Sequence, residues 1–350
     1  MMSKKVLVAM SGGVDSSVAA YLLREKGYQV AGATFRLWGN ADNAVNDARQ
    51  VCAQLGIAHH VLDMQELFRK QVVDAFVREY QQGKTPNPCV FCNRYIKFSA
   101  FLEQATALGF DEIATGHYAQ IIRNDQSGRY ELQMAVHPEK DQSYVLYPLT
   151  QQQLGHCLMP LGRYPKDEIR RIAEQNDLLV AGKPDSQDIC FVPDGDYGAF
   201  LEHYTGEPAR PGMFVDCQGK VLGSHKGLER YTVGQRKGLG ISLGQPAFVS
   251  DISTETGNIT LDCNQQVLFK TEVTVGELNW VSIAEQAEPF SAQVRLRYSQ
   301  KAALALVTPS RSGGVTVRFA QPQRAPTKGQ SAVLYDGTRV LAGGVIVDSN

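Results

Sequence analysis

The stretch Met10–Ser17, which reads MSGGVDSS, limits the fold more than any other part of the sequence. An apolar run (6–9) precedes it and a helix-like segment (18–23) follows it, so the order predicts a strand, a tight glycine turn and the start of a helix. Glycines permit positive φ and close approach of a ligand to the main chain, and the free N–H groups of a helix start favour an anion. With Ser16 as the expected N-cap and three serine hydroxyls as added donors, the stretch is interpreted as a phosphate cradle.

This loop is neither a Walker A motif nor the G-x-G-x-x-G turn of dinucleotide-binding folds. Asp15 would lie beside phosphate oxygens, so its charge calls for a bound cation, and Mg²⁺ is the cation we expect. An ordinary glycine turn is the alternative, but this string is far less common than a glycine pair. The loop resembles that of the N-type ATP pyrophosphatases, which implies that ATP converts a substrate oxygen into an AMP leaving group and that pyrophosphate is released.

Residues 1–115 alternate strand-like and helix-like segments, which predicts a parallel sheet covered by helices, with ligands at the carboxyl ends of its strands. Later segments add a hairpin and a helix that begins near a proline. Two polar, turn-rich stretches are expected to be loops. The expected strands are 6–9, 28–35, 59–63 and 110–115, the helices 43–55, 67–82, 95–109 and 166–173, the hairpin 121–132, and the loops 85–93 and 183–191.

The chain changes character after about residue 205, where short strand-like pieces are separated by Gly, Pro and Asp. Alternating apolar residues in the last part, with Asp336-Gly337 as a hairpin turn, predict a small antiparallel barrel. The expected fold class is therefore α/β with a parallel-sheet nucleotide-binding domain, a small mixed domain and a C-terminal antiparallel β-barrel. The expected divisions are 1–204 for the ATP pyrophosphatase catalytic domain, 205–275 for the small central domain and 276–350 for the C-terminal β-barrel.

The charge and the composition limit which binding partners and which cellular compartment we expect. The chain has a net charge of −1, but residues 289–350 carry eight Lys/Arg against two Asp/Glu, so the rest is strongly acidic. A basic segment of this kind favours a polyanion such as nucleic acid, although a solvated surface without a partner fits equally well. The sequence has no long apolar run, and its seven cysteines are too few for a disulfide scaffold. We expect a cytoplasmic protein without membrane contact, and a monomer.

Three of the cysteines, Cys89, Cys92 and Cys190, fall in the two polar loops, and the other four have no partner motif. A C-x-x-C pair alone is weak evidence: it is half a zinc site or a redox pair. Combined with an adenylating site, however, exposed thiols indicate sulfur transfer. One cysteine would carry sulfur as a persulfide and another would release it by disulfide exchange, which requires lowered thiol pKa values.

The motifs, taken together, resemble those of the bacterial and organellar tRNA-specific 2-thiouridylases over nearly the whole chain. That family thiolates C2 of the wobble uridine (position 34) of tRNA with ATP, and takes sulfur from a cysteine desulfurase, directly or through a relay protein. The motifs are MSGGVDSS (10–17), NPCVFCNRYIKF (87–98), ATGHYA (114–119), KDQSY (140–144), DSQDICF (185–191), RYTVGQRKGL (230–239) and RYSQ (297–300).

The resemblance assigns roles position by position. It implies that Cys190 bears the persulfide, that Cys92 is its catalytic partner, and that Asp15 belongs to the reaction centre. ATP is expected to contact Ala9, Met10, Ser11, Gly12, Gly13, Val14, Asp15, Ser16, Phe35 and Gly116. The tRNA is expected to contact Asn87, Pro88 and Cys89 at the target base and His117, Lys140, Asp141, Gln142, Arg297, Tyr298 and Gln330 elsewhere.

Position 89 departs from the family, because many members carry aspartate where this chain has cysteine. Cys89, Cys92 and Cys190 would then be able to hold a four-iron four-sulfur cluster that binds sulfide at an open iron. Two further alternatives stay open. A synthetase or amidotransferase that shares the pyrophosphate loop would not need the cysteines, and a non-catalytic RNA-binding module would bind tRNA without releasing pyrophosphate.

Overall fold

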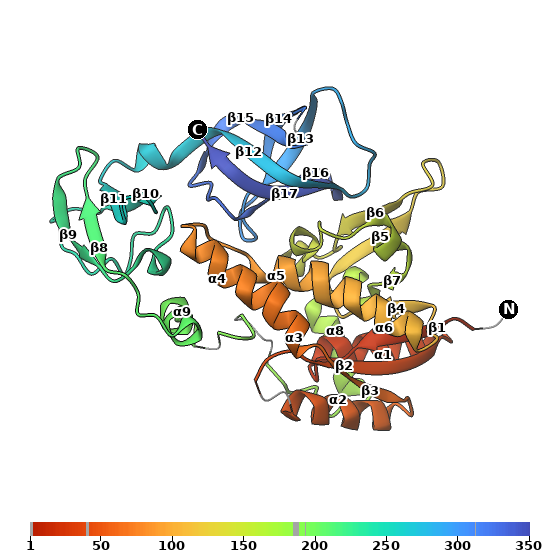
Figure 1. Ribbon diagram of the computed structural model, residues 1–350. Coiled ribbons are helices and arrows are strands. Elements are labelled where there is room, and N and C mark those ends of the chain that lie inside the picture. Colours follow the sequence, from red (N-terminus) through yellow and green to blue (C-terminus); the bar gives the residue numbers. More distant parts are fainter. Residues whose placement is uncertain (1–2, 40–41, 185–188, 193, 312) are drawn as a thin grey trace.

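A computed structural model (Figure 1) describes residues 3–39, 42–184, 189–192, 194–311 and 313–350. Its N-terminal part is a parallel sheet in the order β3-β2-β1-β4-β7. The expected parallel sheet is therefore confirmed. The strands are β1 (Lys5–Ala9), β2 (Gln29–Arg36), β3 (His59–Asp63), β4 (Glu112–Ala114) and β7 (Cys157–Leu158).

Helices cover both faces of this sheet, which explains why β1 is apolar after its first residue, Lys5. Leu7 faces one hydrophobic core, while Val6 and Val8 face the other, as the period of two in a strand requires. The first core is closed by α3 (Gln65–Phe68), η1 (Arg69–Val73), α4 (Asp74–Gln81), α5 (Pro88–Phe91), η2 (Cys92–Ala100) and α6 (Phe101–Ala107). The second is closed by α1 (Val14–Glu25), α2 (Asp42–Gln54) and α8 (Lys166–Gln175).

Two local expectations are wrong. Helix α1 begins at Val14 with Gly13 as N-cap, because the Ser16 hydroxyl donates back to Gly13 O instead of capping the helix. The segment 85–93 is a loop only as far as Asn87, whose side-chain oxygen accepts from Cys89 N and starts α5 at Pro88. Helix α5 then continues into the π-helix η2, so Cys92 is helical and not in a loop.

The central part is a four-stranded sheet in the order β10-β11-β8-β9 around a small core that contains Phe214. It lies at the left of Figure 1, and α9 leads into it. This arrangement agrees with the expected small mixed domain. The elements are α9 (Tyr197–Thr205), β8 (Gly212–Val215), β9 (Val221–His225), β10 (Phe248–Ser253) and β11 (Asn258–Asp262).

The C-terminal part is the expected antiparallel barrel, which is closed because β12 pairs with both β15 and β17. The expected turn at Asp336-Gly337 joins β16 to β17, with Gly337 at φ 60. The expected hairpin, β5 and β6, extends the barrel sheet through the pair Arg339↔Gln133. The elements are β5 (Ala119–Arg123), β6 (Tyr130–Met134), β12 (Phe269–Trp280), β13 (Phe290–Arg295), β14 (Ala303–Pro309), β15 (Val315–Arg324), β16 (Ser331–Asp336) and β17 (Arg339–Ser349).

The remaining elements are short and connect the larger parts. Among the described residues, no helix is both long and apolar enough to cross a membrane. The short connecting elements are α7 (Gln151–Gly155) and the 3₁₀ helices η3 (Pro138–Lys140), η4 (Ser143–Val145), η5 (Pro160–Arg163), η6 (Leu228–Arg230) and η7 (Gln265–Leu268).

Candidate active site

The glycine loop lies where the strand order of the parallel sheet reverses, between the carboxyl ends of β1 and β4, which is the usual ligand position in such folds. Gly12 has φ +72, and a Cβ there would lie 2.8 Å from Ala44 O. Gly116 follows β4, and its added Cβ would lie 2.9 Å from Ser16 N. Both glycines are therefore required by close backbone contacts, and the structure brings Gly116 directly against the start of α1.

The serine hydroxyls organise this loop from within. Ser16 Oγ accepts from Ser11 N at 3.1 Å, and Ser17 Oγ donates to Gly13 O at 2.9 Å. The side chains of Met10 and Val14 are buried in the second core. A ligand would consequently meet the main chain of these two residues and not their side chains.

Asp15 has protein partners that sequence reasoning missed. Its Oδ1 accepts from Lys166 Nζ and from Tyr118 OH, each at 2.7 Å. The Lys166 side chain is only 10% exposed. Asp15 therefore has an ammonium group that balances its charge without a metal ion, and Mg²⁺ at this site stays a prediction.

A second lysine lies at the edge of the same loop. Lys183 Nζ donates to Gly12 O at 3.1 Å and also pairs with the Asp47 carboxylate. A lone lysine outside a motif carries no sequence signal, so neither this residue nor Lys166 could be singled out beforehand. Together they place two ammonium groups beside a loop of main-chain N–H groups, which suits a polyphosphate.

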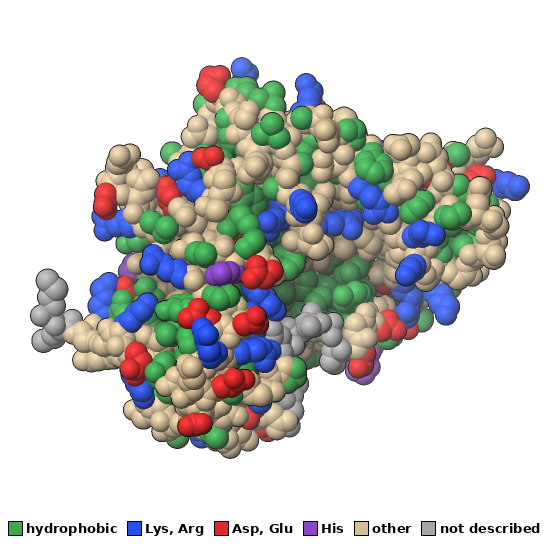
Figure 2. All heavy atoms as spheres, turned by 180° about the vertical axis from the view of Figure 1, so that it is seen from behind, with side chains coloured by type: hydrophobic (Ala, Val, Ile, Leu, Met, Phe, Trp, Pro, Cys, Tyr) green, Lys and Arg blue, Asp and Glu red, His purple; other side chains and the backbone are tan. Residues whose placement is uncertain are grey.

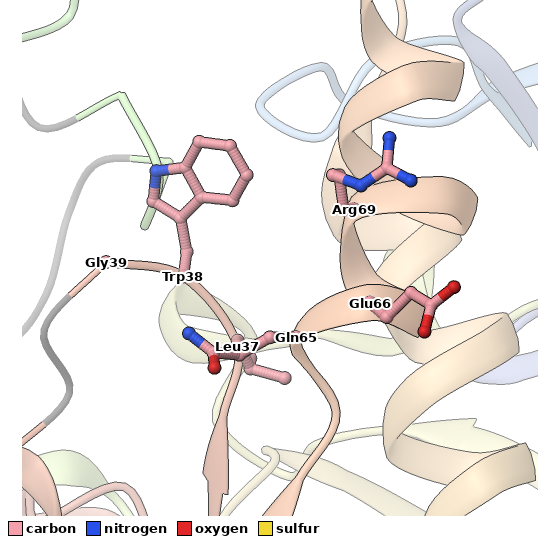
Figure 3. A pocket seen from close by; sticks show the side chains of 6 residues that line it. All are labelled: Leu37, Trp38, Gly39, Gln65, Glu66 and Arg69. Atoms are coloured by element: carbon pink, nitrogen blue, oxygen red, sulfur yellow. The ribbon is translucent and has the colours of Figure 1, made fainter.

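Phe35 is the last residue but one of β2 and packs edge-on against Phe101, with ring centroids 4.9 Å apart, so it is half-buried. A cavity of about 520 Å³ opens just beyond it, after the carboxyl ends of β2 and β3. Trp38 and Arg69 lie on opposite sides of this hollow (Figure 3). The lining residues are Leu37, Trp38, Gly39, Gln65, Glu66 and Arg69.

The three loop-motif cysteines lie together, although Cys190 comes from a distant part of the chain. Cys92 is buried, whereas Cys89 and Cys190 are exposed, and none of the three is in a disulfide. Burial raises the pKa of Cys92 to about 12, nearby Cys190 and Cys89 add to the rise, and Lys97 opposes it. Burial of the sulfur likewise raises the pKa of Cys190, again opposed by Lys97. Both groups are therefore thiols at neutral pH, and the lowered pKa values expected for reactive cysteines are not observed.

Aromatic packing explains how Cys190 reaches this place. Its neighbour Phe191 is buried against Phe76 and Phe200, with ring centroids 5.2 Å away in each case. These contacts attach the segment to α4, which precedes α5 in the same layer. The first four residues of the motif 185–191 lie outside the described residues.

A chain of contacts connects the loop to the thiols. Gly116 touches the start of α1, and the next residue, His117, lies 5.6 Å from the Phe98 ring on η2. Lys97 acts electrostatically on His117 and on both Cys92 and Cys190. The glycine loop and the thiols are thus linked through neighbouring residues after β4 and on η2, and their joint use as one site stays a prediction.

Two residues expected to contact tRNA have buried side chains. Asp141 is 1% exposed at its side chain and accepts from Ser143 and Arg295, so its carboxylate supports the fold and does not face RNA. His117 bonds Thr115 at 2.8 Å, and burial together with Lys97 holds its pKa well below the ordinary value. Direct contact of these two residues with tRNA stays a prediction, and in this structure both side chains are turned into the protein.

Other predicted tRNA residues lie at the junction of the three parts. Arg297 Nη2 donates to Val233 O, Ala325 O and Thr327 Oγ1, so it connects the central sheet to the barrel. Gln330 donates to Thr85 O at 2.7 Å, and Gln142 accepts from Tyr118 N. These three side chains therefore form hydrogen bonds within the protein itself.

Tyr298 and Cys89 are exposed. Tyr298 is 47% exposed, donates to Asp141 O at 3.1 Å, and is an electrostatic neighbour of Cys89. Asn87 and Lys140 are half-buried, and Pro88 is buried. On the rear face, Lys and Arg side chains gather around a hollow between the lobes (Figure 2).

Comparison with known proteins identifies the family. Family models match residues 4–194 (tRNA methyl transferase HUP domain), 198–261 (tRNA methyl transferase PRC-barrel domain) and 270–346 (Aminomethyltransferase beta-barrel domain). The tRNA-specific 2-thiouridylase MnmA of Acetivibrio thermocellus is 48% identical over 359 residues, with 99% of this chain and all of that protein covered. The chain belongs to the tRNA-specific 2-thiouridylase family.

Two further family members give the same result. The MnmA of Carboxydothermus hydrogenoformans is 48% identical, with 98% of this chain and 97% of that protein covered. That of Clostridioides difficile is 46% identical, with 99% of each chain covered. The family resemblance and the expected fold class are therefore confirmed.

Proposed function

We propose that this protein is a tRNA-uridine 2-sulfurtransferase that thiolates the wobble uridine of tRNA. The observation that carries the proposal is the convergence of Cys92 and Cys190 on a site continuous with the glycine loop. A synthetase or amidotransferase with this loop has no use for two thiols from distant parts of the chain. An RNA-binding module has no use for the loop.

The reaction divides into two transfers. The uracil C2 oxygen attacks the α-phosphorus of ATP, which forms an O–P bond and expels pyrophosphate. The outer sulfur of a Cys190 persulfide then attacks C2, AMP departs with the oxygen, and the Cys92 thiolate attacks Cys190 Sγ. That last attack breaks the S–S bond, leaves sulfur on the base and joins the two cysteines, so a dithiol reductant must restore them.

Each group of residues has a part in this scheme. The loop N–H groups, Lys166 and Lys183 would hold the phosphates, and the cavity beside Trp38 would accept the nucleoside side of ATP or the extruded base. Both thiols must lose their protons before reaction, and opening of the site around bound tRNA would lower their pKa values by hydration.

The residues present fit ATP better than they fit a resident metal. Asp15 and Asp47, the carboxylates at the loop, are both paired with lysines, so Mg²⁺ would arrive with the phosphates. Within the described ranges no three His, Cys, Asp or Glu side chains are grouped to hold a metal ion. Cys89, Cys92 and Cys190 as placed therefore do not fit an iron–sulfur cluster, and we route no step through one.

The partners and divisions follow from the same proposal. Sulfur would come from a cysteine desulfurase or a relay protein, and the enzyme would work as a cytoplasmic monomer. We also propose functional divisions at 1–204, 205–275 and 276–350, with the +6 charge of residues 289–350 binding tRNA phosphates.

The test replaces Cys92 and Cys190 singly with serine and measures 2-thiouridine in tRNA by nucleoside mass spectrometry. We expect at least a 100-fold loss in each variant, with pyrophosphate release retained. Cys217→Ser, an exposed thiol outside the site, is the matched control. Retained thiolation in either active-site variant would reject the sulfur-transfer mechanism, and a brown chromophore in protein purified without oxygen would favour the cluster.

A further inference from the structure

Lys97 is a half-buried cation that the scheme above does not use. It lies on η2, between the buried residues Ile96 and Phe98. In the part of the chain that the structure describes, no carboxylate forms an ion pair with it. A partly buried lysine without an acidic partner usually interacts with another group that carries negative charge.

The π-helical backbone places Lys97 on the same face of η2 as Cys92. In an α-helix of 3.6 residues per turn, side chains five positions apart point about 140° away from each other. A π-helix instead closes hydrogen bonds between residues five apart, which brings such side chains over the same face. Because η2 runs from Cys92 to Ala100, residues 92 and 97 are such a pair.

The groups that face the two sulfurs are few. Cys92 is influenced by Lys97, Cys190 and Cys89, and Cys190 by Lys97 and Cys89. His117 is also near Lys97, but burial and the lysine charge keep it neutral, so it supplies no positive charge. Among the described residues, Lys97 is thus the cation that acts electrostatically on both thiols.

We propose that Lys97 is a positioning residue that stabilises the sulfur anions of Cys92 and Cys190 by presenting one ammonium group to both. In this structure burial outweighs this effect, so both sulfurs stay protonated at neutral pH. When the site opens and burial weakens, the lysine charge selects these two sulfurs for ionisation over other exposed thiols. The effect of Lys97 on the two sulfurs is inferred from the positions of these residues, whereas its importance for catalysis rests on the proposed function.

The test measures the rate at which iodoacetamide alkylates Cys190 between pH 7 and 9.5, with the site resolved by peptide mass spectrometry. The thiolate displaces iodide, so the rate reports the ionised fraction without ATP or tRNA. For Lys97→Met, which keeps the apolar stem, we expect a roughly three- to tenfold slower reaction at pH 8, equivalent to a loss of about half to one pKa unit. Lys97→Arg should remain within twofold of the original protein.

Lys220→Gln, an exposed lysine in the central part, is the control and should not change the profile. If Lys97→Met leaves the Cys190 profile unchanged while circular dichroism shows a folded protein, the proposal is overturned. If that variant does not fold, Lys97→Arg decides: a folded arginine variant with a slowed profile would also contradict the claim. A slowed Lys97→Met profile, together with an original protein that does not thiolate tRNA, would reject the proposed function and leave the role of Lys97 intact.

Discussion

The glycine loop and the thiol cluster are two halves of one site built in opposite ways. At the loop every charge is matched: Asp15 has Lys166, and Asp47 has Lys183. At the cluster, Lys97 has no acidic partner among the described residues and the sulfurs it faces are uncharged at neutral pH. The loop is thus already arranged for its ligand, whereas the thiols need a change in their surroundings before they react.

The sharpest way to break this contrast is to remove the charge match at the loop. Lys166→Met leaves Asp15 without its cation, and the unbalanced carboxylate repels phosphate. We expect roughly a 100-fold loss of pyrophosphate release, the size typical of losing one charged donor at a reaction centre. The alkylation rate of Cys190 should not change.

Arg171→Gln, an exposed residue on the same helix, provides the comparison and should retain activity. Equal loss in both variants would show that the Lys166–Asp15 pair is not the cause. A parallel change in thiol reactivity would show that the two halves are not independent.

The next prediction detaches the Cys190 segment. Phe191 is 3% exposed, so Phe191→Ala should lower the free energy of unfolding by about 3–5 kcal/mol, since it removes a buried ring and leaves a cavity. Thiolation should fall further than pyrophosphate release, because the loop does not depend on this ring. Urea unfolding and the two activity assays measure the difference.

Tyr197→Ala is the matched control, because this ring packs on the same cluster while remaining 38% exposed. Its effect on stability should be smaller. A Phe191→Ala variant that thiolates normally would contradict the anchoring role.

The smallest expected effect concerns pH. Folding raises the pKa of Cys92 from 9.0 to about 12, so the folded state favours the neutral thiol. Its contribution to stability is complete below about pH 9 and is lost as the pH rises toward 12. Cys92→Ala should therefore lose less stability between pH 9 and 10.5 than the original protein, by roughly 1 kcal/mol or more.

Urea unfolding at a series of pH values gives this difference, and Cys217→Ala, with an exposed thiol, is the comparison. Identical alkaline slopes for the Cys92→Ala variant and the original protein would show that the sulfur is hydrated in the folded state.

Much of the architecture was predictable because it depends on local patterns. The strand 59–63 and the Asp336-Gly337 turn lie where the strand-like segment and the turn residues of the sequence predict them. The errors come from competition over short distances: the Ser16 hydroxyl has an alternative acceptor in Gly13 O, and Pro88 begins a helix inside a stretch rich in turn residues.

The residues of the site also divide into those that the sequence predicts and those that only the tertiary structure reveals. The order of residues alone implies an adenylating loop and a pair of functional thiols, because those signals are carried by side chains a few positions apart. Other properties depend on packing between distant segments of the chain. Such packing pairs Lys166 with Asp15, buries the Asp141 carboxylate, and holds the Cys190 segment in place through Phe191. Burial and the distance between charges set these properties, and both arise when the layers close on one another.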